Sequence, residues 1–289
     1  MKILITGADG QLGADLCKTL KNHKVIPLTI ADGDITDFSF VKKQCLAHKP
    51  DVIINTAAYV LVDACGDNRD LAYQVNALGA RNMAVAAEQI GAALVQISTD
   101  YVFGGEEKLR TTPYTEFDVP VPCSAYGASK LAGEDYARHL CRRHFIIRSS
   151  ALFGAAGAMG KGGNFVETML RMAKERTELR VVNDQIFSPT YTPDLAARIA
   201  QLIDTQYYGI VHITNSGACS WYEFTVEILK QAGIKTPVAP ITSDQYPQKA
   251  KRPAYSALDN YQLRLLNMAA MPAWQDALKR YLIEKGYIA

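Results

Sequence analysis

A chain of 289 residues, of which 48% are apolar and 21% charged, has the composition of a globular protein with a substantial core. The net charge is +2 and the basic residues are scattered, so nucleic acid is not an expected partner. No apolar run approaches the ~20 residues of a membrane helix, so a membrane is not expected either. The six cysteines lie far apart, without a CxxC motif or a Cys/His cluster, which predicts no metal site and a reduced, cytoplasmic protein.

In the first half of the chain, short apolar runs alternate with segments of helical spacing. The runs predict buried strands at 2–6, 24–29, 51–58, 93–98 and 144–150. The opening MKILITGADG is therefore a strand with a glycine turn rather than a signal peptide. Helices are predicted over 12–22, 38–48, 69–90 and 126–142, the second with Phe38, Val41, Cys45 and Leu46 on its apolar face. This alternation predicts an α/β fold with a Rossmann-type, doubly wound parallel sheet.

Beyond about residue 152 the rhythm changes. Residues 154–164 are a glycine-rich loop without periodicity, helices are predicted over 165–176 and 221–232, and a proline-studded stretch runs from 237 to 253. We therefore expect a nucleotide-binding Rossmann domain formed by 1–152 with about 181–215. A smaller C-terminal substrate-binding lobe is expected from about 153–180 and 216–289.

The glycine turn carries the first chemical signal. Gly7, Gly10 and Gly13 follow the first strand directly and open the first helix. Glycine lets the backbone turn tightly and approach a diphosphate, whose charge meets the exposed N–H groups and the helix dipole. Because the triplet lies on the first strand of the alternating series, it predicts a dinucleotide site rather than a plain tight turn.

The sequence does not choose between NADPH and NADH. An acid at the end of the second strand is typical of NAD sites and a nearby Arg of NADP sites, but Thr29 and Ile30 stand there and Asp32 and Asp34 come slightly late. The small residues at the end of the third strand, Thr56, Ala57 and Ala58, would let a ribose lie against the strand ends.

A tyrosine four residues before a lysine occurs twice, as Tyr126/Lys130 and Tyr281/Lys285. The first pair opens a helix about 27 residues after Ser98 and Thr99, whose strand ends at the edge where open parallel sheets bind ligands. Residues i and i+4 share a helix face, so tyrosine and lysine can reach one site. The second pair has no such strand-end hydroxyls and is expected to be a solvated pair on a C-terminal helix.

The first pair fits carbonyl reduction. Tyr126 would supply the proton as hydride reaches the carbon, and Thr99 would polarise the carbonyl. An adjacent Lys130 ammonium would lower the pKa of the phenol from about 10 and would also bind the ribose hydroxyls. His212, flanked by apolar residues, is expected to be a core histidine rather than a base, and Trp221 and Trp274 are expected to be packing anchors.

Five stretches carry a family resemblance: TGADGQLG, STDYVFGG, YGASKLAGE, NDQIFSPTYTPDLA and SWYEF. Together they resemble the dTDP-4-dehydrorhamnose reductase family of extended short-chain dehydrogenases, over nearly the whole chain. The resemblance implies a Rossmann domain, a small nucleotide-sugar lobe and reduction of a 4-keto-6-deoxy sugar on a dTDP carrier. It implies a dTDP-sugar as partner and leaves a homodimer open.

The resemblance also implies roles for residues that match by position. Thr99, Tyr126 and Lys130 match the catalytic three. Ser98, Thr99, Asn164, Phe165 and Arg252 fall on the substrate side. The residues expected to bind NADPH or NADH are Gly7, Gly10, Gln11, Leu12, Gly13, Asp34, Ile35, Ala57, Ala58, Tyr59, Tyr126 and Lys130.

This chain departs from the family pattern on the substrate wall. Ala151 stands where the family commonly has a tryptophan, and Val60, Leu61 and Gly66 replace its usual residues in the AYVLVDACG stretch. The resemblance therefore implies reductase chemistry more firmly than the identity of the sugar.

Two other functions compete with a reductase on the same fold. An epimerase or dehydratase returns the hydride to the sugar, and a dehydratase would need an Asp-Glu pair where Asp100 is followed by Tyr101. A non-catalytic NADP-binding regulatory subunit would have no need to keep Thr99, Tyr126 and Lys130 together.

Overall fold

The computed structural model describes residues 1–157 and 163–288, so the middle of the predicted glycine-rich loop, 158–162, lies outside the described residues. Its centre is a sheet of six parallel strands in the order β10-β5-β4-β3-β1-β2. The strands are β1 Lys2–Thr6, β2 Lys24–Leu28, β3 Val52–Asn55, β4 Ala93–Thr99, β5 His144–Ser149 and β10 Gly209–His212. The predicted strands and the parallel sheet are confirmed.

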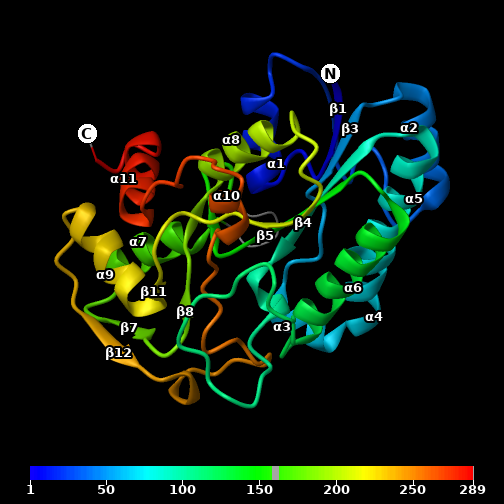
Figure 1. Ribbon diagram of the computed structural model, residues 1–289. Coiled ribbons are helices and arrows are strands. Elements are labelled where there is room, and N and C mark those ends of the chain that lie inside the picture. The colour runs from blue at the N-terminus through cyan, green and yellow to red at the C-terminus, as the bar shows by residue number, and fades with distance from the viewer. Residues whose placement is uncertain (158–162, 289) are drawn as a thin grey trace.

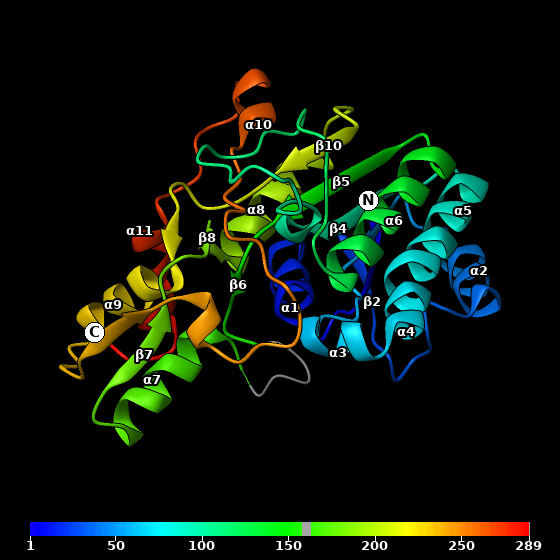
Figure 2. The same ribbon diagram turned by 90° about the horizontal axis from the view of Figure 1, so that it is seen from below.

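Helices cover both faces of the sheet, as a doubly wound fold requires. Helices α1 (Gln11–Thr19) and α8 (Thr192–Leu202) pack on one face, and α2 (Phe38–His48), α5 (Ala80–Ile90) and α6 (Ala125–Leu140) on the other. The short α3 (Val62–Asp67) and α4 (Arg69–Tyr73) lie beside α6. Figure 1 shows α2, α5 and α6 side by side, and Figure 2 shows α1 and α8 across the sheet from them.

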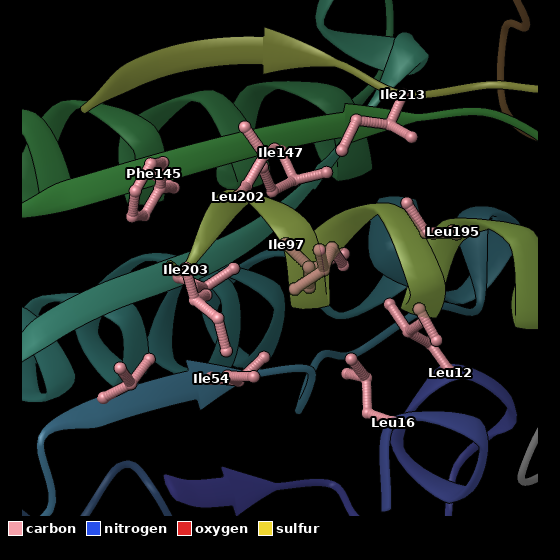
Figure 3. Packing of buried hydrophobic residues seen from close by; sticks show 14 of the residues in the cluster. Leu12, Leu16, Ile54, Ile97, Phe145, Ile147, Leu195, Leu202, Ile203 and Ile213 are labelled. Atoms are coloured by element: carbon pink, nitrogen blue, oxygen red, sulfur yellow. The ribbon is translucent and has the colours of Figure 1, made fainter. Parts of the chain in front are cut away.

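Each face of the sheet has its own core because successive strand residues point to opposite faces. Ile54 and Ile147 face α1 and α8, where they meet Leu16 and Leu195, as Figure 3 shows. Their strand neighbours, such as Ile53, face the second core with α2, α5 and α6. This burial on both faces explains why the strands read as continuous apolar runs in the sequence.

The predicted helix over 69–90 is divided. A π-helical turn, Gln74–Gly79, lies between α4 and α5. It directs the buried Asn76 side chain at the backbone of Tyr59, accepting from Tyr59 N (2.8 Å) and donating to Tyr59 O (3.0 Å). A second difference is Leu46, which is 50% exposed, because the buried side of α2 is the i, i+4 pair of Val41 and Cys45.

The smaller lobe is built on a second apolar cluster, formed by residues from Phe153 to Leu282. Its elements are β6 (Leu152–Phe153), α7 (Phe165–Glu175), β7 (Leu179–Val182), β8 (Ile186–Phe187), β9 (Thr190–Tyr191), β11 (Cys219–Ser220), α9 (Trp221–Gln231), β12 (Val238–Ile241) and α11 (Trp274–Glu284). The strands pair in twos, as β11-β8, β12-β7 and β6-β9. Short α10 (Tyr261–Leu265) instead sends Leu263 into the core under the sheet.

The predicted division into a Rossmann domain and a smaller lobe stays a prediction. The elements within the range 181–215 can be compared with it one at a time. α8 and β10, which lie within 181–215, pack with the sheet. By contrast β7, at the start of that range, pairs with β12 of the lobe.

Along the described ranges, 1–157 and 163–288, no helix is long and apolar enough to cross a membrane.

The second Tyr-Lys pair was expected to be solvated, and this expectation is wrong for the tyrosine. Tyr281 is fully buried in the lobe cluster. Its hydroxyl donates to Glu167 Oε1 (2.5 Å) and accepts from Asn164 Nδ2 (3.0 Å). Lys285 lies 3.6 Å from the same glutamate, so this pair braces the lobe.

Candidate active site

A single cavity of about 810 Å³ runs from the glycine turn, past the ends of the strands, into the lobe. The residues that follow β1, β2 and β3 line the cavity. In the sheet β1 lies between β2 and β3, so the order of the strands reverses here, and doubly wound sheets bind ligands at such a switch point. Every residue predicted for the cofactor or the substrate lines this cavity except Gly13. Sequence positions up to 245 apart are thereby brought to one surface.

The glycines of the turn bring backbone directly to the cavity wall, beside Asp9 and Gln11. Gly7 has a φ of +67°, in the left-handed region that favours glycine. Gly13 lies behind the turn, where a Cβ would stand only 2.1 Å from Gly7 O. α1 begins at Gln11, whose side chain donates to Leu152 O (3.1 Å) and accepts from Gly154 N (3.0 Å). This tight glycine turn at a helix N-terminus fits the diphosphate of a dinucleotide.

Beyond the turn, the cavity is lined by Thr29, Ile30, Asp34 and Ile35. The Asp32 carboxylate folds back on the end of β2, accepting from Thr29 N (2.8 Å) and Thr29 Oγ1 (2.9 Å). These two hydrogen bonds hold the pKa of Asp32 below its ordinary value, so it is ionised at neutral pH. The Asp32 carboxylate therefore reaches back to the end of β2, although Asp32 is not among the described residues that line the cavity.

Tyr126 lies beside Thr99 because the first turn of α6 is in close contact with the residues that follow β4. Ser124 caps α6 by accepting from Gly127 N (3.1 Å), and a Cβ on Gly127 would stand 2.0 Å from Tyr101 O. Only a glycine allows this approach, which brings Tyr126 into the cavity beside the Thr99 hydroxyl. The Tyr126 ring packs edge-on against Tyr101, with centroids 5.8 Å apart.

Lys130 lies one turn further along α6 and is anchored to the sheet. Its Nζ donates to Ile97 O (2.6 Å), and the side chain is almost fully buried. Burial lowers the pKa of Lys130 to about 8, and the nearby Glu134 opposes this shift.

The electrostatics of the phenol differ from the sequence expectation. Burial raises the pKa of Tyr126, with the Thr99 hydrogen bond opposing it and the Asp100 charge adding to it. Lys130 was expected to lower that pKa, but in this structure its ammonium is directed to Ile97 O. The chain by itself therefore keeps Tyr126 protonated, the state that a proton donor requires.

A buried ion pair that the sequence analysis missed lies under these residues. Glu134 and Arg148 are 3% and 1% exposed, and their closest atoms are 2.6 Å apart. Ser98 donates its hydroxyl proton to Glu134 Oε1 (2.5 Å), so toward a ligand it can only accept. The signal was present, because Glu134 follows Lys130 at the same i+4 spacing by which Lys130 follows Tyr126.

A second buried carboxylate closes the floor of the cavity. Asp100 is 2% exposed and accepts from Ser256 Oγ (2.6 Å) and Thr99 Oγ1 (3.1 Å). Burial raises the pKa of Asp100 to about 6, against the hydrogen bonds that favour its charged form. Because Ser256 comes from the C-terminal part of the chain, this contact joins the lobe to the end of β4.

On the lobe side, Arg252 is held by Asp63 of α3, with its two terminal nitrogens 3.1 and 3.0 Å from the carboxylate oxygens. This pairing holds the pKa of Asp63 low. Asn164 caps α7 by accepting from Glu167 N (3.1 Å), and its amide nitrogen donates to Gly154 O. Both residues line the cavity, but their side chains already have partners in the fold.

Aromatic rings form the far wall. Trp221 lies against Phe187 and Phe165, with centroids 3.9 and 4.4 Å apart. Ala151 lines the same end with a φ of +43°, an uncommon conformation for a residue with a Cβ. Of the other departures from the family pattern, Val60 lines the cavity, whereas Leu61 and Gly66 do not.

Packing places His212 and the two tryptophans. His212 is fully buried, and its Nδ1 lies 3.1 Å from Tyr114 O and 3.2 Å from Asp259 O, as expected of a core histidine. Trp274 is buried in the lobe cluster, whereas Trp221 also faces the cavity. Within the described residues no group of three His, Cys, Asp or Glu side chains could hold a metal ion.

Comparisons with known proteins agree over the whole length. The family model described as "RmlD substrate binding domain" matches residues 1–286. The chain is 43% identical to the spore coat polysaccharide biosynthesis protein SpsK of Bacillus subtilis, covering 99% of this chain and 98% of that one. A dTDP-4-dehydrorhamnose reductase structure from Clostridium acetobutylicum is 46% identical with a TM-score of 0.93, covering 99% and 100%. One from Bacillus anthracis in complex with NADP is 44% identical with a TM-score of 0.93, covering 98% and 99%.

Proposed function

Because the chain belongs to the RmlD substrate binding domain family, we propose that it reduces the 4-keto group of a dTDP-linked 4-keto-6-deoxy sugar with NADH or NADPH. The product would be dTDP-L-rhamnose or a related deoxysugar for polysaccharide synthesis. The observation that carries the proposal is the convergence of Thr99, Tyr126 and Lys130 on one cavity that is continuous with the glycine turn. A homodimer and a cytoplasmic setting remain predictions.

The reduced nicotinamide supplies the hydride when it is bound. The chain's own residues would do the rest, beginning with Tyr126, whose protonated phenol donates to the carbonyl oxygen as negative charge develops there. Thr99, whose hydroxyl lies beside the phenol, would hold the same oxygen by turning toward it the proton that it donates to Asp100 Oδ1 in this structure. Lys130 would bind ribose hydroxyls from its anchored position under β4. The glycine turn would hold the diphosphate.

The lobe would hold the nucleotide sugar. Arg252 provides the cation for the sugar diphosphate on that side, and Asp63 fixes its orientation. The aromatic wall of Phe165, Phe187 and Trp221 offers flat surfaces to a base or a sugar ring. Ala151, a small residue that lines the cavity, would leave room for the sugar on this side.

A non-catalytic regulatory subunit and an epimerase are the alternatives, and one assay separates all three. A dTDP-4-keto-6-deoxy sugar made in situ is mixed with the protein and reduced nicotinamide, and cofactor oxidation is followed by absorbance. A reductase consumes the cofactor in proportion to the sugar, a regulatory subunit binds it without consumption, and an epimerase releases an isomer with no net oxidation.

Tyr126→Phe tests the assignment of the proton donor. The variant should lose at least about a hundredfold in turnover while keeping its cofactor affinity, because the ring stays and only the donor is removed. Tyr207→Phe is the matched control, since Tyr207 is 51% exposed and does not line the cavity. Unchanged turnover in Tyr126→Phe would exclude this role for Tyr126.

A further inference from the structure

The first turn of α7 forms part of the lobe side of the cavity. Phe165 and Thr168, both on this turn, line the cavity. The Phe165 ring lies against Trp221, with centroids 4.4 Å apart, and it is stacked on Phe224 at 5.8 Å. The position of the aromatic wall therefore depends on where α7 begins and on how firmly its first turn is held.

Asn164 fixes the beginning of α7, and its side chain is used inside the protein. It is 6% exposed, and its Oδ1 caps the helix by accepting from Glu167 N (3.1 Å). Its Nδ2 donates to Gly154 O (3.1 Å) and to the hydroxyl oxygen of Tyr281 (3.0 Å). Because both amide hydrogens are donated within the fold, the Asn164 side chain has no N–H left for a ligand.

Tyr281 holds this amide from the C-terminal part of the chain. Its side chain is fully buried, and it is not among the described residues that line the cavity. Although burial would raise it, hydrogen bonds from Tyr281 and Tyr287 hold the pKa of Glu167 below its ordinary value. The ionised carboxylate can only accept, so Tyr281 donates its proton to Glu167 and offers its oxygen to Asn164.

We infer that Tyr281 is a positioning residue for the nucleotide-sugar side of the site: through Asn164 it fixes the first turn of α7 and, with this turn, the aromatic wall. The inference deepens the proposed function, on which its kinetic part rests. Without the Tyr281 oxygen, one amide hydrogen of Asn164 loses its partner. The turn is then ordered only when the ligand binds, and this ordering weakens the binding.

Two tyrosine variants form a matched pair. Tyr281→Phe and Tyr287→Phe each remove one hydroxyl that donates to Glu167, and of the two hydroxyls only that of Tyr281 also contacts Asn164. Calorimetric titration of the whole protein with dTDP measures Kd. Tyr281→Phe should weaken dTDP binding by about tenfold, the equivalent of one hydrogen bond, and Tyr287→Phe by less than about twofold.

A second variant tests the route through Asn164. Asn164→Ser keeps a residue that can cap the helix but removes the amide, so it should show the same loss of dTDP affinity as Tyr281→Phe. Tyr281→Phe added to Asn164→Ser should change the Kd little further, because the contact between the two side chains is already absent. Losses that multiply in the double variant would contradict this route and overturn the inference.

Turnover gives a readout that a general loss of stability would not produce. Tyr281→Phe should raise KM for the keto-sugar by about tenfold and leave kcat unchanged within about twofold, because Thr99, Tyr126 and Lys130 keep their contacts. Equal Kd values for dTDP in the two tyrosine variants, or a wild type that does not bind dTDP, would overturn the inference. Weaker dTDP binding in Tyr281→Phe alone, without sugar-dependent cofactor oxidation by the wild type, would support the inference and remove the reductase. Sugar-dependent oxidation with equal Kd values would do the reverse.

Discussion

The buried Glu134–Arg148 pair allows a sharp prediction about stability. Both side chains are at most 3% exposed, and Arg148 contacts both carboxylate oxygens of Glu134, at 2.6 to 3.2 Å. Removing one partner leaves a buried charge without compensation, which costs about 3–5 kcal/mol. At roughly 2 °C per kcal/mol for a chain of this size, Arg148→Met or Glu134→Leu should lower Tm by about 6–10 °C.

Thermal and urea unfolding, followed by circular dichroism, measure this cost. Arg142→Met is the matched control, because Arg142 pairs with Glu88 at a similar 2.7 Å but is 91% exposed, so less than about 1 kcal/mol should be lost. The double variant Glu134→Leu/Arg148→Met should recover at least half of the single losses, since it removes both charges. The reasoning fails if either single variant loses no more than Arg142→Met, or if the double loses the sum of the two singles.

The remaining predictions concern the turn and two titrating residues. Gly13→Ala should weaken cofactor binding by at least about tenfold in a titration, because its Cβ would stand 2.1 Å from Gly7 O, whereas Gly66→Ala, with nothing within 4 Å, should not. Burial lowers the pKa of His212 to about 3, so only the unfolded chain gains a proton between pH 6.5 and 3. His212 alone should therefore lower the stability by about 4 kcal/mol over that window, and in urea melts of His212→Asn the fall should be smaller by that amount. Since the pKa of Lys130 is about 8, cofactor affinity should decline above pH 8 in the wild type and stay constant in Lys130→Arg; a flat wild-type profile would contradict the proposed ribose contact.

The sequence by itself determined the architecture and predicted which residues would line the candidate site. Strands buried on both faces must read as apolar runs, so the parallel sheet could be predicted from the runs alone. The glycine turn, Thr99 and the Tyr126/Lys130 pair could be placed as well, because each sits at a fixed offset from a strand end or on one helix face. These relations depend on short distances along the chain, so they can be read directly from the sequence.

Contacts between distant segments were decided only by the tertiary structure. Glu134 finds Arg148 because α6 lies against β5, and Arg252 finds Asp63 across 189 residues. Tyr281 looked like a solvated helix residue until α11 packed it onto Glu167. Asp32 looked too late in the sequence to act at the end of β2, but a turn returns its carboxylate to Thr29. In each case the path of the chain in space determines which partner a side chain contacts and how deeply it is buried, and these in turn affect its charge state. Spacing along the sequence does not give that path.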